Sequence, residues 1–197
     1  EDICANPERP VSALRILHTD DWTELQNLIS IRNFPVVESL GGWFERTAAE
    51  YAEAVAISYE PEAGKREELS YGELNQQANG IAGWLQEQGV TSGSRVVVYL
   101  ERSVELVAAI VGVVKAGGVY VPVDPATPAE RLAFIVADAV PGAILTQTSL
   151  LHRLPETTVP LHCAEHWLSP QSSVLSPQSS VRSPEAVAYV IYTSGST

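Results

Sequence analysis

The sequence lacks several kinds of residue, and each shortage excludes a class of protein. Its 197 residues include no methionine and two cysteines, and 24 acidic side chains outnumber 12 basic ones, of which only Lys65 and Lys115 are lysines. A formal charge of −12 argues against sequence-independent binding to nucleic acid, which needs a basic surface. The longest strongly apolar run, 104–114, is shorter than the roughly 20 residues that cross a bilayer. We therefore expect a soluble protein with neither a nucleic-acid nor a membrane partner.

Two of these absences also bear on the compartment and the extent of the chain. Cys4 and Cys163 lie far apart and form neither a disulfide framework nor a paired metal-ligand motif. The first residues do not have the basic head and apolar middle of a secretory signal. We therefore expect a cytoplasmic location. Because the sequence contains no methionine, we also expect it to be a portion of a longer chain.

Short apolar segments alternate with amphipathic ones from residue 54 onward, and this alternation predicts the fold class. Strands are expected at 54–59, 95–100, 119–123, 143–146, 159–162 and 186–192. Helices are expected at 21–31, 39–53, 70–89, 103–117 and from 127 onward. The run from Val96 to Val98 is apolar on both faces, as a sheet covered by helices on both sides requires. The predicted fold is α/β, with a mostly parallel sheet flanked by helices.

Helix-start signals differ in strength along the chain. Ser70 with Glu73 forms a capping box, and Ser103 opens the next helix. The combination of Thr127 as N-cap, Pro128 in the first turn and Glu130 as capping acid is the strongest of these signals. Lys115 lies near a helix C-terminus, where a cation is favourable, and this structural role accounts for it without a catalytic one.

Several other features have a structural and a functional interpretation. The unit Leu-Ser-Pro-Gln-Ser-Ser-Val occurs at 168–174 and again at 175–181, which indicates a duplicated surface loop or, alternatively, a recognition tract or spacer. The cluster of His162, Cys163 and His166 is either incidental or a metal site. Three tryptophans fit buried helix positions better than a stacking platform: Trp22, Trp43 and Trp84.

The last five residues offer the chemistry that binds phosphate. The expected strand 186–192 runs directly into Thr193, Ser194, Gly195, Ser196 and Thr197. Glycine permits close approach of the backbone, and amides and hydroxyls donate hydrogen bonds to phosphate oxygens. The segment lacks the lysine and the spacing of a Walker loop, and no Gly-x-Gly-x-x-Gly fingerprint is present. Taken alone, its composition favours a flexible end of the chain.

Three separated stretches together resemble one family. They are Leu69-Ser70-Tyr71-Gly72-Glu73-Leu74, the stretch from Lys115 to Pro125 (Lys-Ala-Gly-Gly-Val-Tyr-Val-Pro-Val-Asp-Pro), and the stretch from Ala188 to Thr197 (Ala-Tyr-Val-Ile-Tyr-Thr-Ser-Gly-Ser-Thr). Their order and spacing resemble the first three core motifs of amino-acid adenylation domains of nonribosomal peptide synthetases, within the AMP-forming ligase superfamily. The segment 128–146 is similar to the stretch that comes after the second motif in that family.

The resemblance implies an architecture and a reaction. Residues 38–197 would be the N-terminal part of an adenylation domain's large subdomain, incomplete at its C-terminus, and residues 1–37 a linker from a condensation domain. ATP, with Mg²⁺, and an amino acid would form an aminoacyl adenylate and pyrophosphate, and the acyl group would pass to a phosphopantetheine thiol on a carrier domain. Only Thr193, Ser194, Gly195, Ser196 and Thr197 carry over as contacts to the ATP phosphates.

The sequence also departs from the family, which leaves other functions open. The third motif should continue as Thr-Gly-x-Pro-Lys-Gly, and neither this continuation nor the catalytic lysine, the metal ligand or the amino-acid pocket is present. We therefore expect the chain alone to be inactive. One alternative is a truncated, noncatalytic remnant with a structural or docking role, and another is an acyl-CoA or aryl-acid ligase. The amino acid, the peptide product and the oligomeric state are not predicted.

Overall fold

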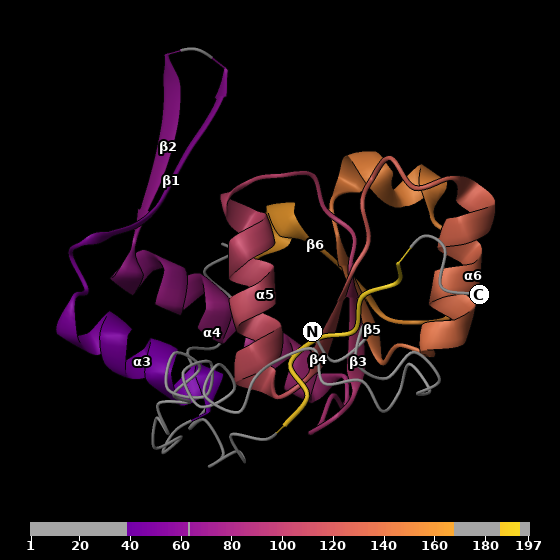
Figure 1. Cartoon of the computed structure of the whole chain (residues 1–197), viewed down its shortest axis with the longest axis horizontal. Helices are drawn as coiled ribbons and strands as arrows, with labels where there is room; N and C mark the ends of the chain where they lie inside the picture. Colours follow the sequence, from indigo (N-terminus) through magenta and orange to yellow (C-terminus); the bar gives the residue numbers. More distant parts are fainter. Residues whose placement is uncertain (1–38, 63, 168–185, 194–197) are drawn as a thin grey trace, which may run out of the picture. The chain divides into compact units, whose positions relative to one another are not determined.

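A computed structural model describes residues 39–62, 64–167 and 186–193 of the chain (Figure 1). The chain divides into two units, Glu1–Pro35 and Val36–Thr197, and every described residue belongs to the second unit. The helix expected at 21–31 and the repeat at 168–181 lie outside the described residues.

A four-stranded parallel sheet forms the centre of this unit. Its strands are β4 (Val119–Pro122), β3 (Arg95–Val98), β5 (Ala143–Thr146) and β6 (Leu161–Cys163), in that order across the sheet. All three pairs of neighbours are parallel. The predicted α/β class with a mostly parallel sheet is thereby confirmed.

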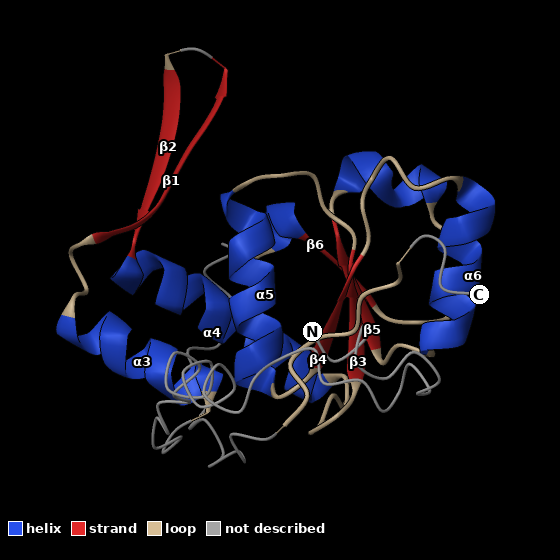
Figure 2. Cartoon of the chain, in the orientation of Figure 1, coloured by secondary structure: helices blue, strands red, loops and turns tan. Residues whose placement is uncertain are grey.

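Helices cover both faces of the sheet (Figure 2). One face packs against α4 (Tyr71–Glu87) and α5 (Val104–Ala116), and the other against α6 (Ala129–Ala139). The alternation along β3 shows the division, because Val96 and Val98 belong to the first core and Val97 to the second. All three valines are at most 1% exposed, as the apolar run in the sequence predicted.

The helix ends confirm two of the predicted signals and contradict a third. Ser70 and Glu73 form the reciprocal capping box of α4, and Ser103 caps α5, which ends at Gly117 in the left-handed conformation with φ 86°. The Thr127 capping box is wrong. The N-cap of α6 is Pro128, which makes no side-chain cap hydrogen bond, and the Thr127 amide that Glu130 would have to bond in a capping box bonds the carbonyl of Asp124 in a turn.

A β-hairpin that the sequence did not predict precedes α4. Strand β1 (Val55–Glu62) pairs antiparallel with β2 (Lys65–Ser70), so the predicted strand at 54–59 is longer than expected and has a partner. The charged run Lys-Arg-Glu-Glu at the start of β2 has no apolar alternation and is exposed along its length. Hydrophobic periodicity identifies strands with a buried face, and β2 does not have one.

Helix α3 (Leu40–Glu50) lies close to α5 through a small residue. A side chain at Gly41 would meet Val114 at 3.7 Å, and Gly41 and Ala48 are the buried residues of the helix. Burial of this small-residue face turns Trp43 outward, where it is 60% exposed. The predicted burial of Trp43 is therefore wrong, whereas Trp84 packs against the first core.

Lys115 connects three helices from a buried position. Its ammonium donates to Asn75 Oδ1 of α4 at 2.6 Å and pairs with Glu45 Oε1 of α3 at 3.0 Å. The residue is 2% exposed, and this burial lowers the pKa of the ammonium although Glu45 opposes the shift. Lys115, near the end of α5, therefore links this helix to α3 and α4 through buried polar contacts.

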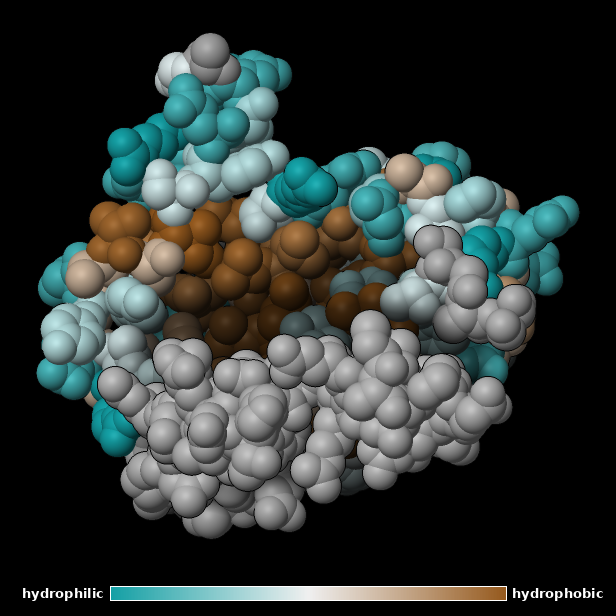
Figure 3. All heavy atoms as spheres, in the orientation of Figure 1, coloured by the Kyte–Doolittle hydropathy of each residue, from teal (hydrophilic) through white to brown (hydrophobic). Residues whose placement is uncertain are grey.

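Figure 3 shows an apolar area at the surface of the molecule, in the region where α5 lies in Figure 1. Its partly exposed residues on α5 recur at helical spacing: Val107, Ile110, Val111 and Val114. A helix that is apolar on all sides is typical of a position enclosed by protein. Among the described residues, no helix combines the length and the apolar character needed to cross a membrane.

Candidate functional site

The carboxyl ends of the parallel strands define one edge of the sheet, and in open α/β sheets ligands bind at this edge. Asp124 follows β4 there, and Gln147 follows β5. The Asp124 carboxylate accepts a hydrogen bond from the amide of Ala126 at 2.7 Å, and the Gln147 side chain accepts one from the amide of Glu101 at 3.0 Å. These bonds fix the loops that leave β3 and β4.

The segment 186–193 lies along the outer edge of β4. The amide of Tyr120 donates to the carbonyl of Ala188, and the amide of Val190 donates to the carbonyl of Tyr120, both at 3.0 Å. These bonds form a single parallel bridge between Tyr120 and Tyr189, whose rings lie 5.6 Å apart. The sequence predicts a strand at 186–192. Among the described residues it is limited to one bridge, because Tyr120 is the one residue of β4 whose amide and carbonyl bond this segment.

Thr193 is the member of the predicted phosphate-binding segment that the structure describes. The segment runs parallel to β4, with Tyr189 paired to Tyr120. Thr193 comes four residues after Tyr189, and Asp124 comes four residues after Tyr120. Thr193 therefore lies at the carboxyl edge of the sheet, as Asp124 does. The carbonyl of Thr193 accepts a hydrogen bond from Arg131 Nη2, in the first turn of α6, at 3.5 Å. Ser194, Gly195, Ser196 and Thr197 lie outside the described residues.

A cluster on α6 contacts Tyr192, which precedes this segment, and Thr193, its first residue. We call it the α6 clamp and define it as Arg131, Phe134 and Asp138 with Tyr192. The guanidinium of Arg131 lies 5.1 Å from the ring centre of Phe134 and 5.9 Å from that of Tyr192. The two rings meet edge to face at 6.4 Å and 90°, and the Tyr192 hydroxyl donates to Asp138 Oδ2 at 2.5 Å. Sequence reasoning missed this cluster, although its spacing on the helix, i, i+3 and i+7, was a usable signal.

The electrostatics of the clamp keep the phenol a donor. Burial raises the pKa of Tyr192, and the hydrogen bond to Asp138 and the charge of that carboxylate raise it further. Arg95 and Arg131 oppose the shift. The hydroxyl is therefore protonated at neutral pH and holds the Asp138 carboxylate through a charge-assisted hydrogen bond.

Two further side chains, Arg153 and Tyr99, contact backbone carbonyls of the loop between β4 and α6. Arg153 donates to the carbonyl of Pro125 and, at 3.3 Å, to the carbonyl of Thr127. The hydroxyl of Tyr99 lies 3.5 Å from the same Pro125 carbonyl. The carboxyl edge next to Thr193 is therefore built from backbone positions fixed by buried or half-buried side chains.

The His162, Cys163 and His166 cluster does not assemble as metal ligands. His162 stacks on Trp84, with ring centres 4.4 Å apart and planes 8° from parallel, and its other neighbour is Trp167 at 6.1 Å. Burial, aided by the nearby His166, lowers the pKa of His162 to about 4. Across the described ranges, no three His, Cys, Asp or Glu side chains come together as a metal site would require.

Comparisons with known proteins agree with this architecture. The sequence pattern of the family described as AMP-binding enzyme matches residues 44–197. The chain is 45% identical, over 78% of its length, to a linear gramicidin synthase of Brevibacillus parabrevis. It is 33% identical, over its whole length, to surfactin synthase subunit 3 of Bacillus subtilis. It covers only 3% and 15% of these two relatives, respectively.

Solved structures share the fold. The chain superposes on a nonribosomal peptide synthetase, FmoA3, in its AMPPNP-bound form with a TM-score of 0.71, at 29% identity and over 87% of this chain and 18% of that one. A second FmoA3 structure gives a TM-score of 0.69 at 33% identity. A fatty acyl-adenylate ligase of L. pneumophila reaches 0.67 at 24% identity, which concerns the fold alone.

Proposed function

Because the chain belongs to the AMP-binding enzyme family, we propose that it is part of an amino-acid-activating domain of a nonribosomal peptide synthetase. In the complete domain, an amino-acid carboxylate attacks the α-phosphorus of ATP and pyrophosphate leaves, which gives an aminoacyl adenylate. A phosphopantetheine thiol on a carrier domain then displaces AMP. Residues 38–197 would be the N-terminal part of this domain, residues 1–37 the linker from a condensation domain, and the location cytoplasmic.

One observation carries the proposal: Thr193 lies at the carboxyl edge of a parallel sheet, in a segment that the family pattern matches through residue 197. Thr193, Ser194, Gly195, Ser196 and Thr197 would bind the phosphates of ATP. Hydroxyls, backbone amides and a glycine are a donor set that suits phosphate oxygens. These contacts would hold the triphosphate in position and stabilise charge as the α-phosphorus reacts.

The resemblance limits what these residues supply. It carries over only the phosphate contacts, so we assign no catalytic side chain and no Mg²⁺ ligand to residues 38–197. Mg²⁺ bound with ATP would neutralise phosphate charge in the complete domain. Amino-acid activation is favoured over acyl-CoA or aryl-acid activation because the relatives at 33–45% identity are peptide synthases, whereas the acyl ligase is 24% identical.

The test is amino-acid-dependent ATP/pyrophosphate exchange by the complete domain that contains this chain. The wild type should exchange with at least one amino acid. Thr193→Val, which removes the hydroxyl and keeps the shape of the side chain, should lower kcat/KM for ATP by about tenfold to a hundredfold. Thr91→Val is the matched control, because Thr91 is exposed in the loop before β3, at the opposite edge of the sheet, and should leave exchange unchanged.

Two results would contradict the proposal in different ways. Absence of exchange with every amino and hydroxy acid, together with no ATP binding, would favour the noncatalytic remnant. Exchange driven by fatty or aryl acids alone would favour the other ligase class. Equal activity of Thr193→Val and Thr91→Val would refute the role of Thr193 and leave the reaction class standing.

A further inference from the structure

The segment that carries Thr193 has few contacts with the sheet. Only the bridge between Tyr120 and Tyr189 connects it to β4 among the described residues. Val187 and Ile191 point outward, at 63% and 57% exposed, and between them Val190 packs against the second core. Backbone pairing therefore fixes the segment at Tyr189, and something else must fix it at Thr193.

Contacts with α6 occur at that second point. Tyr192 packs against the second core, bonds Asp138 through its hydroxyl and lies under the Arg131 guanidinium. Arg131 reaches the backbone of Thr193 itself. The clamp thus combines an edge-to-face ring pair, a cation over two rings and a charge-assisted hydrogen bond within two turns of one helix.

The composition of the clamp suggests a role beyond stability. Phe134 is 52% exposed, and both Arg131 and Asp138 lie on the exposed side of α6. Exposed pairs of this kind add little to folding free energy. Their common feature is that each contacts Tyr192 or Thr193, the last two described residues before the rest of the predicted phosphate-binding segment.

We propose that Arg131, Asp138 and Tyr192 are positioning residues that fix the entry of the phosphate-binding segment against α6 and thereby set the orientation of Thr193 toward ATP. This inference rests on the proposed function. This role requires no contact between the three side chains and the nucleotide. Tyr192 is held through its hydrogen bond to Asp138, and Arg131 bonds the carbonyl of Thr193, so that both residues have one defined position against α6.

A positioning role predicts a kinetic pattern that a purely structural role does not. In the complete domain, Tyr192→Phe removes the hydrogen bond and keeps the ring pair. We expect kcat/KM for ATP to fall about tenfold, because a small misplacement of Thr193 weakens its contacts in the transition state. KM for the amino acid and the melting temperature should stay close to the wild-type values, because the ring remains packed against the core.

Two further variants and a control make the test specific. Asp138→Ala should match Tyr192→Phe, and the double variant should be no worse than either, because both changes remove the same bond. Asp138→Asn keeps an acceptor and should restore most of the activity. Tyr189→Phe is the matched control: its ring contacts Tyr120, and the described residues provide no hydrogen-bond partner for its hydroxyl.

The outcomes separate this inference from the function on which it rests. A wild-type domain without exchange would overturn both. An active wild type with Tyr192→Phe and Asp138→Ala indistinguishable from Tyr189→Phe would overturn the inference alone. So would additive losses in the double variant, or a loss of activity that parallels a loss of thermal stability.

Discussion

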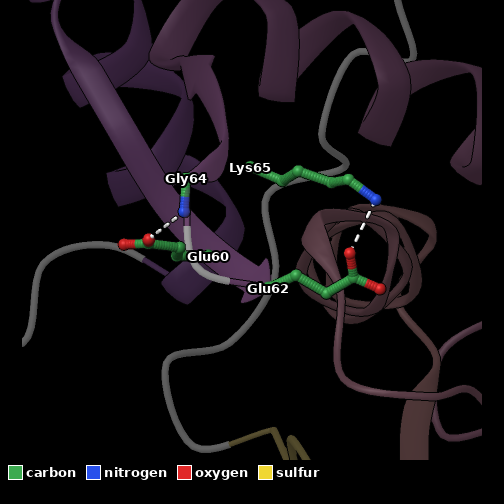
Figure 4. A network of polar contacts seen from close by, with 4 residues as sticks. All are labelled: Glu60, Glu62, Gly64 and Lys65. Atoms are coloured by element: carbon green, nitrogen blue, oxygen red, sulfur yellow. Dashed lines mark hydrogen bonds and ion pairs between the residues drawn. The ribbon is translucent and has the colours of Figure 1, made fainter.

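The β1–β2 hairpin and the four-stranded sheet stabilise their strands by opposite means. In the sheet, β5 is buried at all four positions and β3 at three of four, and helices cover both faces. In the hairpin, every residue of both strands is exposed or half-exposed. Polar contacts close its tip, where Lys65 pairs with Glu62 at 2.6 Å and the Gly64 amide donates to Glu60 at 2.8 Å (Figure 4).

This difference shows where the free energy of folding is concentrated. Burial of apolar area stabilises by about 25 cal/mol per Å², whereas an exposed ion pair contributes about 0–1 kcal/mol. Changes where helices pack on the sheet should therefore be costly, and changes at the exposed tip of the hairpin should be tolerated. Three substitutions test the comparison.

The largest effect is expected where α4 and α5 are in closest contact. A Cβ at Gly112 would lie 2.7 Å from Ile81 Cβ and 3.2 Å from the Ala78 carbonyl, atoms that cannot move aside without shifting the helix. Gly112→Ala should lower the free energy of unfolding by about 3 kcal/mol, because overpacking outweighs the better helix propensity of alanine. Urea unfolding of the chain, followed by circular dichroism, measures this change.

Gly83→Ala is the matched control within α4. Nothing lies within 4 Å of a Cβ at Gly83, so alanine should stabilise the chain there by about 0.5–1 kcal/mol. The two substitutions are chemically identical, and opposite signs are expected. Destabilisation by both, or by neither, would refute the close α4–α5 contact as the cause.

The same contrast explains which elements could be predicted from sequence. The strands around Val96–Val98 and Ala143–Thr146 have a burial signal, because a covered strand must be apolar. Strand β2 has no such signal, since a two-stranded exposed hairpin requires no apolar face. Local capping was predictable at Ser70, where the bonds are within four residues.

Long-range contacts were not predictable in the same way. The outward turn of Trp43 results from how closely Gly41 approaches α5. The predicted capping box cannot form because the Thr127 amide, which Glu130 would bond, is used in a turn. The chemistry of the segment from Thr193 onward could be predicted from its residue types. Its support by Tyr192 and Asp138, 54 residues apart, required the structure.

The next effect is expected at the edge strand β6 and depends on pH. His162 has a folded-state pKa of about 4 against an ordinary value of 6.5, because burial between Trp84 and Trp167 disfavours its charged form. A depressed folded pKa means that the stability is fully present above pH 6.5 and is lost as pH falls through 6.5 toward 4. We expect a loss of about 1–2 kcal/mol over this window, since the ring is partly exposed.

His162→Phe should flatten this dependence, because phenylalanine keeps the stack on Trp84 and cannot be protonated. His152→Gln is the matched control, because it removes an exposed imidazole from another part of the chain. Unfolding by urea at half-unit intervals from about pH 4 to about pH 7 gives the comparison. An unaltered slope in His162→Phe would show that His162 does not cause the pH dependence.

The smallest effect is expected at the tip of the hairpin. Lys65→Ala removes an ion pair whose side chains are 71% and 68% exposed, so the free energy of unfolding should change by about 0–0.5 kcal/mol and the change should vanish in high salt. Urea unfolding at low and at high ionic strength measures both. A salt-independent loss above about 1 kcal/mol would mean that the hairpin is coupled to the helical layer through β2, which ends at the Ser70 cap of α4. The sheet and the hairpin would then unfold as one cooperative unit. The two regions would differ in solvent exposure but not in their contribution to the free energy of unfolding.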